Sequence, residues 1–212
     1  MKNETKEIYE TLFERHPALR AVKTEIAAAF ETVIASYIEG GKLLVCGNGG
    51  SAADSEHIVG ELMKRFRKDR PVDSNIIAGL AQYGEDGKAL GACLEGTLPA
   101  VALTSHLSLS TAFSNDKEPS ATFAQQLLGL GEKKDVLLCL STSGNSKNCV
   151  YAAMLAKVKG LKVISLTGEK TSKLDDLSDV CVRVPETETF KIQELHLPVY
   201  HALCAMLEEE FF

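Results

Sequence analysis

The sequence predicts an α/β protein built on a doubly wound parallel sheet. Five short runs are rich in β-forming residues and apolar on both faces, as buried parallel strands are; they cover 42–47, 99–104, 135–141, 162–168 and 180–184. Helical patterns separate most of these runs, and two of the runs lead through a loop of small polar residues directly into a helix. This alternation is typical of a parallel sheet covered by helices.

Two helices are expected before the first strand, at 5–15 and 18–39. Pro17 marks the start of the second helix, and the glycines at 40–41 end it. Within the second helix, apolar residues repeat at helical spacing, at Val22, Ile26, Ala29, Phe30 and Val33. The chain therefore enters its first strand from a long helix with an apolar face.

Two later segments depart from the simple alternation. Residues 75–98 hold five glycines and have mixed polarity, so we expect an insertion that is partly helical and partly loop. Its tip, Gly84–Gly87, should be exposed and lie near the mouth of the functional site. Residues 191–212 should form a long final helix that Pro198 kinks.

Composition narrows the class of protein. The 212 residues suit a single domain, 1–212, and the net charge of -6 argues against a nucleic-acid binder. No apolar run approaches the roughly 18 residues of a membrane helix, and the polar N-terminus is not a secretory signal. The six cysteines are scattered, and several lie in apolar runs. We therefore expect a cytoplasmic protein that binds neither nucleic acid nor membrane.

Two loops of small polar residues follow the first and third predicted strands, CGNGGS at 46–51 and STSGNS at 141–146. The free N–H groups and positive dipole end of the following helix favour an anion there, and small residues let the backbone close around a phosphate. Serines at 51 and 146 could serve only as helix caps, but caps explain one serine per loop and not four hydroxyls in six residues. Neither loop has a nucleotide-binding pattern, so a phosphate on another kind of molecule is expected.

Titratable residues follow the first of these loops. His57 and Glu61 are four residues apart on the predicted helix, so they share a face and can hold a divalent metal or act as acid and base. Alone, such a pair is more often a surface contact. On the last helix, Gln193 and His201 lie about 12 Å apart along the axis, and they share one metal only if both reach inward or if different subunits supply them. His196 is expected to be packed or hydrogen-bonded.

Several blocks together resemble one family, the SIS-domain phosphoheptose isomerases (sedoheptulose 7-phosphate isomerases). The blocks span most of residues 40–205 and read GGKLLVCGNGGSAADSEHIVGEL, FSNDKE, DVLLCLSTSGNS, KVISLTG and RVPETETFKIQELHLPVYHALC. The resemblance implies a flavodoxin-like three-layer SIS domain with packing helices at both ends. It departs from the compact members in the longer segment 75–98 and in Phe190, which stands where they often carry an acid.

The resemblance also implies a set of site residues. Substrate-binding positions match Asn48, Gly49, Gly50, Ser51, Glu61, Asn115, Asp116, Ser141, Thr142, Ser143, Ser146 and Gln193. The zinc ligands of the family match His57, Glu61, Gln193 and His201, which implies one zinc ion per subunit. A homotetramer is implied as well, and the apolar faces of 18–39 and 192–207 are too extensive for a small sheet to cover, which also predicts subunit contacts.

The implied reaction converts sedoheptulose 7-phosphate into D-glycero-D-manno-heptose 7-phosphate through an enediol. Glu61 is the candidate base and His201 the partner acid or base, although Glu61 as a metal ligand is less free to act as a base. A second reading is a non-catalytic SIS protein that binds a sugar phosphate or the replication initiator DnaA; such a relative lacks the full set of four ligand types. A third reading, a sugar-phosphate sensor, normally needs an added DNA-binding module.

Overall fold

The computed structural model describes all residues, 1–212, and contains one five-stranded parallel sheet. The strand order is β2-β1-β3-β4-β5, and each strand pairs in parallel with its neighbours. The strands are β1 Leu43–Gly47, β2 Ala100–Ala102, β3 Val136–Leu140, β4 Lys162–Thr167 and β5 Val180–Arg183. The predicted fold class is therefore confirmed. This order reverses between β1 and β3, and ligands of open α/β sheets bind beyond the carboxyl ends of the strands at such a point.

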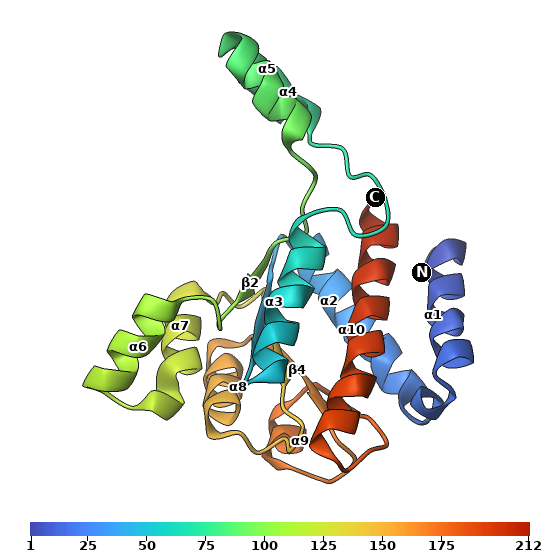
Figure 1. Cartoon of the computed structure of the whole chain (residues 1–212), viewed down its shortest axis with the longest axis vertical. Helices are drawn as coiled ribbons and strands as arrows, with labels where there is room; N and C mark the ends of the chain where they lie inside the picture. Colours follow the sequence, from blue (N-terminus) through green and yellow to red (C-terminus); the bar gives the residue numbers. More distant parts are fainter.

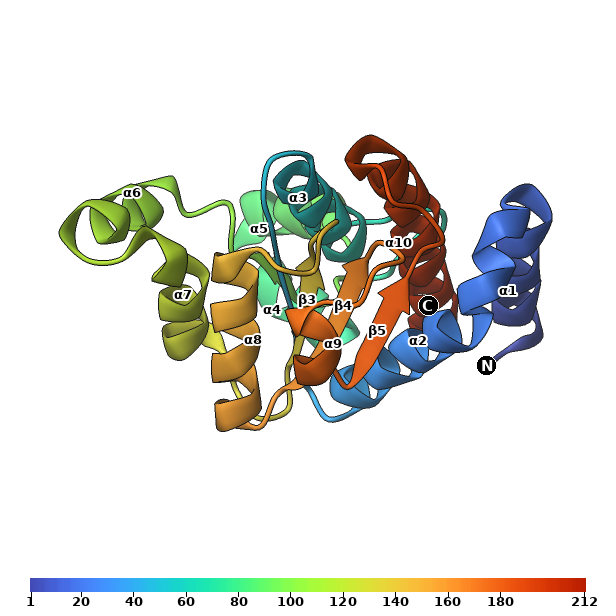
Figure 2. The ribbon, with the colours of Figure 1, turned by 90° about the horizontal axis from the view of Figure 1, so that it is seen from below.

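The sheet is buried on both faces because successive side chains of a strand point to opposite sides. Leu43 and Val45 of β1 join one apolar cluster, and Leu44 and Cys46 join the other. The first cluster lies under α2 (Lys23–Ile38), α3 (Gly50–Met63) and α10 (Thr189–Phe211); the second lies under α7 (Thr122–Leu130), α8 (Lys147–Lys159) and α9 (Lys173–Leu177). Figure 2 shows the three layers, with α8 and α10 on opposite sides of the sheet.

The terminal helices pack on one another. α1 (Asn3–Arg15) lies against α10, and a 3-10 turn, Pro17–Val22, precedes α2, so the predicted second helix opens as a tighter helix. α10 continues through Pro198. Most apolar side chains of α2 and α10 are covered within the chain, by each other, by α1 and by the sheet. Ile38 at the end of α2 and Leu197 on α10 remain 73% and 41% exposed, so part of each apolar face stays available for a partner subunit.

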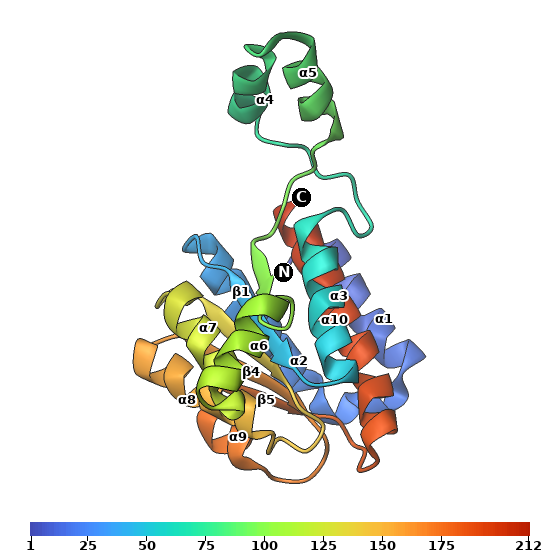
Figure 3. The same cartoon turned by 60° about the vertical axis from the view of Figure 1, so that its left-hand side comes forward.

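The segment 75–98 forms a helical hairpin, α4 (Ser74–Ala81) and α5 (Gly84–Cys93), that projects from the body (Figures 1 and 3). Its turn is at Tyr83, which is 79% exposed, whereas Gly87 is buried inside α5 against Leu80. Of the predicted tip Gly84–Gly87, the first three residues are exposed and only Gly87 is buried. The hairpin follows the C-terminal end of α3, whereas the CGNGGS loop precedes its N-terminal end (Figure 1). Within one chain it therefore lies away from the polar loops.

The remaining helices lie outside the β2 edge of the sheet. α6 (Leu107–Asp116) follows β2 and extends outward, and a 3-10 turn, Pro119–Ala121, leads into α7 (Figure 1). No helix in the protein combines the length and the apolar character that a membrane span requires.

Candidate active site

The two polar loops meet at the point where the strand order reverses. After β1 the chain turns at Gly49, whose φ of +57° favours glycine, and α3 begins at Gly50. Asn48 and Asn148 exchange hydrogen bonds through their amides, Nδ2 to Oδ1 at 2.9 Å and 2.7 Å, and so join the first loop to the start of α8. Ser51 is buried inside the first turn of α3, where Gly49 is the cap, so the capping interpretation does not hold for Ser51.

The STSGNS loop is ordered by its own hydroxyls. Ser141 Oγ donates to Ser146 Oγ at 3.0 Å, and the backbone N–H of Asn145 donates to Ser143 Oγ at 3.2 Å. Ser146 occupies the cap position of α8 but makes no capping bond. Gly144 has a φ of +63°, and a Cβ there would collide with Ser172. The serine hydroxyls therefore make hydrogen bonds within the loop and do not cap the N-terminus of α8.

A pocket of about 260 Å³ opens beside this loop. Its polar lining includes the hydroxyls of the loop and of the two segments that follow β4 and β5, from Thr142, Ser143, Thr171, Thr187 and Thr189, together with Lys170. Glu169 and Glu186 also line the pocket, so the donors in it that suit a phosphate are the hydroxyls and Lys170.

Three titratable side chains come together where α3 crosses α10. His57 Nε2 lies 3.2 Å from Glu61 Oε1 and 3.4 Å from His201 Nε2. The side chain of His57 is 43% exposed and that of Glu61 is 13% exposed, so the cluster is open to a small ligand yet partly desolvated. Burial, and then the neighbouring His57, lower the pKa of His201.

A second layer behind His57 was not anticipated from the sequence. Tyr200 OH donates to Asp54 Oδ1 at 3.0 Å and lies 3.2 Å from His57 Nδ1. With Tyr200 donating to Asp54, its oxygen is free to accept from His57 Nδ1–H, which leaves a lone pair on Nε2. Burial raises the pKa of Asp54. The only sequence signals were that Asp54 precedes His57 by three residues and Tyr200 precedes His201 by one.

The donor set partly fits a zinc site. Two ligands on one tetrahedral zinc at ~2.0–2.1 Å stand roughly 3.4 Å apart, close to the spacings from His57 to its two neighbours. In this chain, however, no group of three His, Cys, Asp or Glu side chains closes around one point. Gln193, the fourth predicted ligand, lies instead against the start of α3: its Nε2 would be 2.7 Å from a Cβ at Gly50.

The other predicted residues divide into two groups. His196 is packed as expected: it is fully buried, its Nε2 lies 3.3 Å from Thr167 O, and burial lowers its pKa to about 4. Asn115 and Asp116 stand at the outer end of α6, are exposed, and bond to each other at 2.9 Å. Within one chain, the helix α6 that carries them lies apart from α3 and α10 (Figures 1 and 2).

Comparison with known proteins agrees with this geometry. The SIS domain profile matches residues 11–86 and 91–168. The phosphoheptose isomerase of Rhodospirillum rubrum is 40% identical over 184 residues, covering 87% of this chain and 85% of its own length. The solved phosphoheptose isomerase of Neisseria gonorrhoeae superimposes with a TM-score of 0.74 at 31% identity (97% of this chain, 94% of that one). That of Francisella tularensis superimposes with a TM-score of 0.76 at 29% identity (99% and 100%).

A parallel sheet of this order, with small polar loops at its switch point, is the fold of a SIS domain. The identities and coverage go further: the chain belongs to the phosphoheptose isomerase family of SIS-domain enzymes.

Proposed function

We propose that this enzyme interconverts sedoheptulose 7-phosphate and D-glycero-D-manno-heptose 7-phosphate. The observation that carries the proposal is the distance between the two polar centres. His57 follows Gly50 by seven residues, which places the titratable cluster roughly 10 Å along α3 from the phosphate-type loops. A seven-carbon chain with a terminal phosphate spans eight bonds, or about 9 Å when extended. A phosphate held by the loops therefore brings the carbonyl end to the cluster.

The proposed chemistry uses Glu61 and His201. Glu61 removes a proton from C1 of the ketose while His201 protonates the carbonyl oxygen on C2, which gives an enediol. Glu61 then returns the proton to C2 while His201 takes one from the hydroxyl on C1, which gives the aldehyde. The distances from His57 to both side chains, 3.2 Å and 3.4 Å, support their working on neighbouring carbons and oxygens.

A zinc ion is proposed as the cofactor, held by His57, Glu61 and His201. Gln193, the fourth ligand of the family pattern, lies against Gly50 in this chain, so it would have to be supplied by another subunit. When bound, it would polarise the carbonyl and stabilise negative charge on its oxygen. Tyr200 and Asp54 would orient His57 for this role, as hydrogen-bond partners of ligating histidines do.

The substrate proposal is tested with sedoheptulose 7-phosphate, arabinose 5-phosphate and fructose 6-phosphate, each with and without zinc. We expect turnover of the heptose phosphate. In the Ser141→Ala, Ser143→Ala double variant the Michaelis constant should rise at least ~10-fold, because the variant loses the Ser143 hydroxyl that lines the pocket and the Ser141 hydroxyl that orders the loop through Ser146. A matched control is Ser178→Ala, whose hydroxyl bonds Ser165 away from the loop. Unchanged saturation in the double variant would move the phosphate elsewhere.

We further propose a homotetramer. The apolar side chains available for subunit contacts are spread over several elements: they include Tyr83 on the hairpin (79% exposed), Leu107 on α6 (74%), Ile38 on α2 (73%) and Val158 on α8 (84%). Helices as short as α4 and α5 are marginal in water without packing partners, and within this chain they pack mainly on each other. Light scattering at micromolar concentration should report four subunits, and a monomer there would refute the proposal.

A further inference from the structure

Glu61 lies in the last turn of α3, and a buried arginine holds that turn. The chain leaves α3 in an extended conformation at Lys64, so the last carbonyls of the helix have no donor within it. Arg70 supplies two donors: its Nη2 donates to Glu61 O at 2.8 Å, and its Nη1 donates to Leu62 O at 2.6 Å. A cation at a helix C-terminus also complements the dipole. The backbone of the candidate base is thus fixed by a side chain nine residues further along.

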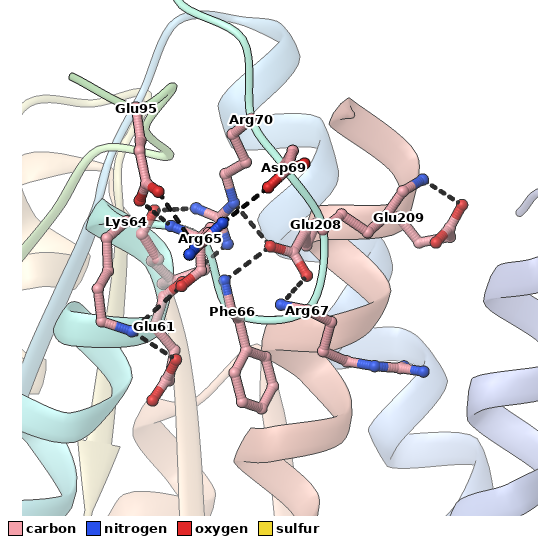
Figure 4. A network of polar contacts seen from close by, with 12 residues as sticks. Glu61, Lys64, Arg65, Phe66, Arg67, Asp69, Arg70, Glu95, Glu208 and Glu209 are labelled. Carbon is pink, nitrogen blue, oxygen red and sulfur yellow. Dashed lines mark hydrogen bonds and ion pairs between the residues drawn. The ribbon is translucent and has the colours of Figure 1, made fainter. Parts of the chain in front are cut away.

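The arginine is in turn fixed by α10. Its Nε lies 2.8 Å from Glu208 Oε1, and the two side chains are 0% and 1% exposed. Glu208 also accepts the backbone N–H groups of Phe66 and Arg67, both at 2.8 Å. Figure 4 shows the carboxylate at the centre of the loop that leaves α3. A buried carboxylate with three donors is fully paired, as a buried charge must be.

The returning segment of the chain is tied to the same place. The backbone N–H of Gly96 donates to Arg70 O at 2.8 Å, and that of Leu98 donates to Leu62 O at 2.9 Å. By contrast, Lys64 Nζ, 3.2 Å from Glu61 Oε2, is 59% exposed, and an exposed pair of this kind contributes little. The last turn of α3 is therefore held chiefly by Arg70 and by the backbone around it.

α10 connects the Arg70–Glu208 pair to His201, the proposed partner of Glu61 in catalysis. His201 and Glu208 are seven residues apart on α10, which places them on the same face, two turns from each other. α3 contacts α10 at its start through Gln193, in its middle through Tyr200 and His201, and at its end, through Arg70, at Glu208. The contact through Arg70 fixes the position of the Glu61 turn relative to the helix that carries His201.

We infer that Arg70 and Glu208 are positioning residues for the isomerase reaction: their buried ion pair sets the distance between Glu61 and His201. The inference rests on the proposed role of Glu61 as the base. Proton transfer requires heavy atoms within hydrogen-bond reach, and a displacement of about 1 Å costs up to ~100-fold in rate. The CGNGGS loop lies at the other end of α3, and none of the hydrogen bonds of Arg70 or Glu208 reaches either polar loop.

The test uses Glu208→Gln, which keeps the shape but removes the charge, and Arg70→Lys, which keeps the charge but loses the forked donor. Each should lower kcat roughly 10- to 100-fold, with KM for sedoheptulose 7-phosphate changed less than about twofold. Amide hydrogen exchange at Phe66 and Arg67 should become faster in both variants. If Glu208→Gln does not fold, the same measurements on Arg70→Lys test the inference.

The chain offers a matched control in Asp135. This buried carboxylate accepts the backbone N–H groups of Lys42 (3.0 Å) and Glu132 (2.8 Å) and pairs with Lys42 Nζ at 2.6 Å, but it lies at the start of β3, at the amino end of the sheet. Asp135→Asn should lower the melting temperature much as Glu208→Gln does and leave kcat unchanged.

Two results would overturn the inference: wild-type kcat in both Arg70→Lys and Glu208→Gln, or an equal loss of kcat in Asp135→Asn. Glu61→Gln, assayed alongside, separates this failure from that of the proposed function. If Glu61→Gln is inactive while both positioning variants are fully active, only the positioning role fails. If Glu61→Gln turns over at the wild-type rate, the proposed base is wrong, and the positioning role fails with it.

Discussion

Replacing Glu61 by Gln should lower turnover of sedoheptulose 7-phosphate by at least ~100-fold, the usual cost of a lost general base. Glutamine keeps the shape of the side chain and one oxygen near His57 Nε2, now 3.2 Å from Glu61 Oε1, but it cannot accept a proton. The direct readout is solvent deuterium incorporation at the carbon next to the carbonyl, because exchange reports proton removal even when the full reaction is slow.

The matched control for this variant is Glu56→Gln. Glu56 lies on the same helix, but its carboxylate accepts from Thr104 on the β2 side, outside the site, so the change should leave both exchange and turnover intact. Proton exchange at the wild-type rate in Glu61→Gln would show that Glu61 is not the base. If the wild-type protein with zinc neither exchanges the proton nor isomerises any phosphorylated ketose, the catalytic proposal fails as a whole.

The second large effect is expected at His57. His57→Ala removes the side chain that faces both Glu61 and His201, so zinc affinity should fall by more than the ~10- to 100-fold typical of losing an outer hydrogen-bond partner. Metal content after dialysis measures this without an activity assay. We expect about one zinc per wild-type subunit and close to none in the variant.

A histidine outside the site provides the comparison. His106 Nδ1 lies 2.7 Å from Gln126 Oε1 on the opposite side of the sheet, so His106→Ala should keep its zinc. Treatment of the wild-type protein with a chelator should remove activity, and added zinc should restore it. A His57→Ala protein that binds zinc as tightly as the wild type would rule out this ligand set.

The sheet could be predicted from the sequence because each strand is marked by a short run of neighbouring apolar residues. The three central strands β1, β3 and β4 are apolar runs buried on both faces, a pattern that can be read from the sequence alone. The edge strand β2 is shorter than predicted, since pairing stops at Ala102 and a turn follows. In the hairpin the glycines were misleading: Gly87 and Gly91 lie within α5, where Gly87 packs closely on α4.

The site was predictable only in part, for the same physical reason. Spacing on one helix places His57 beside Glu61, but the approach of His201 and the layer formed by Tyr200 and Asp54 depend on how α10 crosses α3. The pairing of Arg70 with Glu208 joins residues 138 positions apart, which no local pattern reveals. Family resemblance predicts that Asn115 and Asp116 lie at the active site. This stays a prediction, because only contacts between subunits of the proposed tetramer would bring them there.

The hydrogen bond from Gly96 N to Arg70 O has a practical consequence for engineering the protein. It brings the two ends of the hairpin segment to within 2.8 Å of each other on the surface of the body. Joining points so close together needs only a tight turn, and such points tolerate deletion and insertion well. The hairpin is thus an exchangeable module: a short turn, a longer pair of helices or an unrelated peptide can be spliced there while the sheet and the end of α3 keep their own contacts.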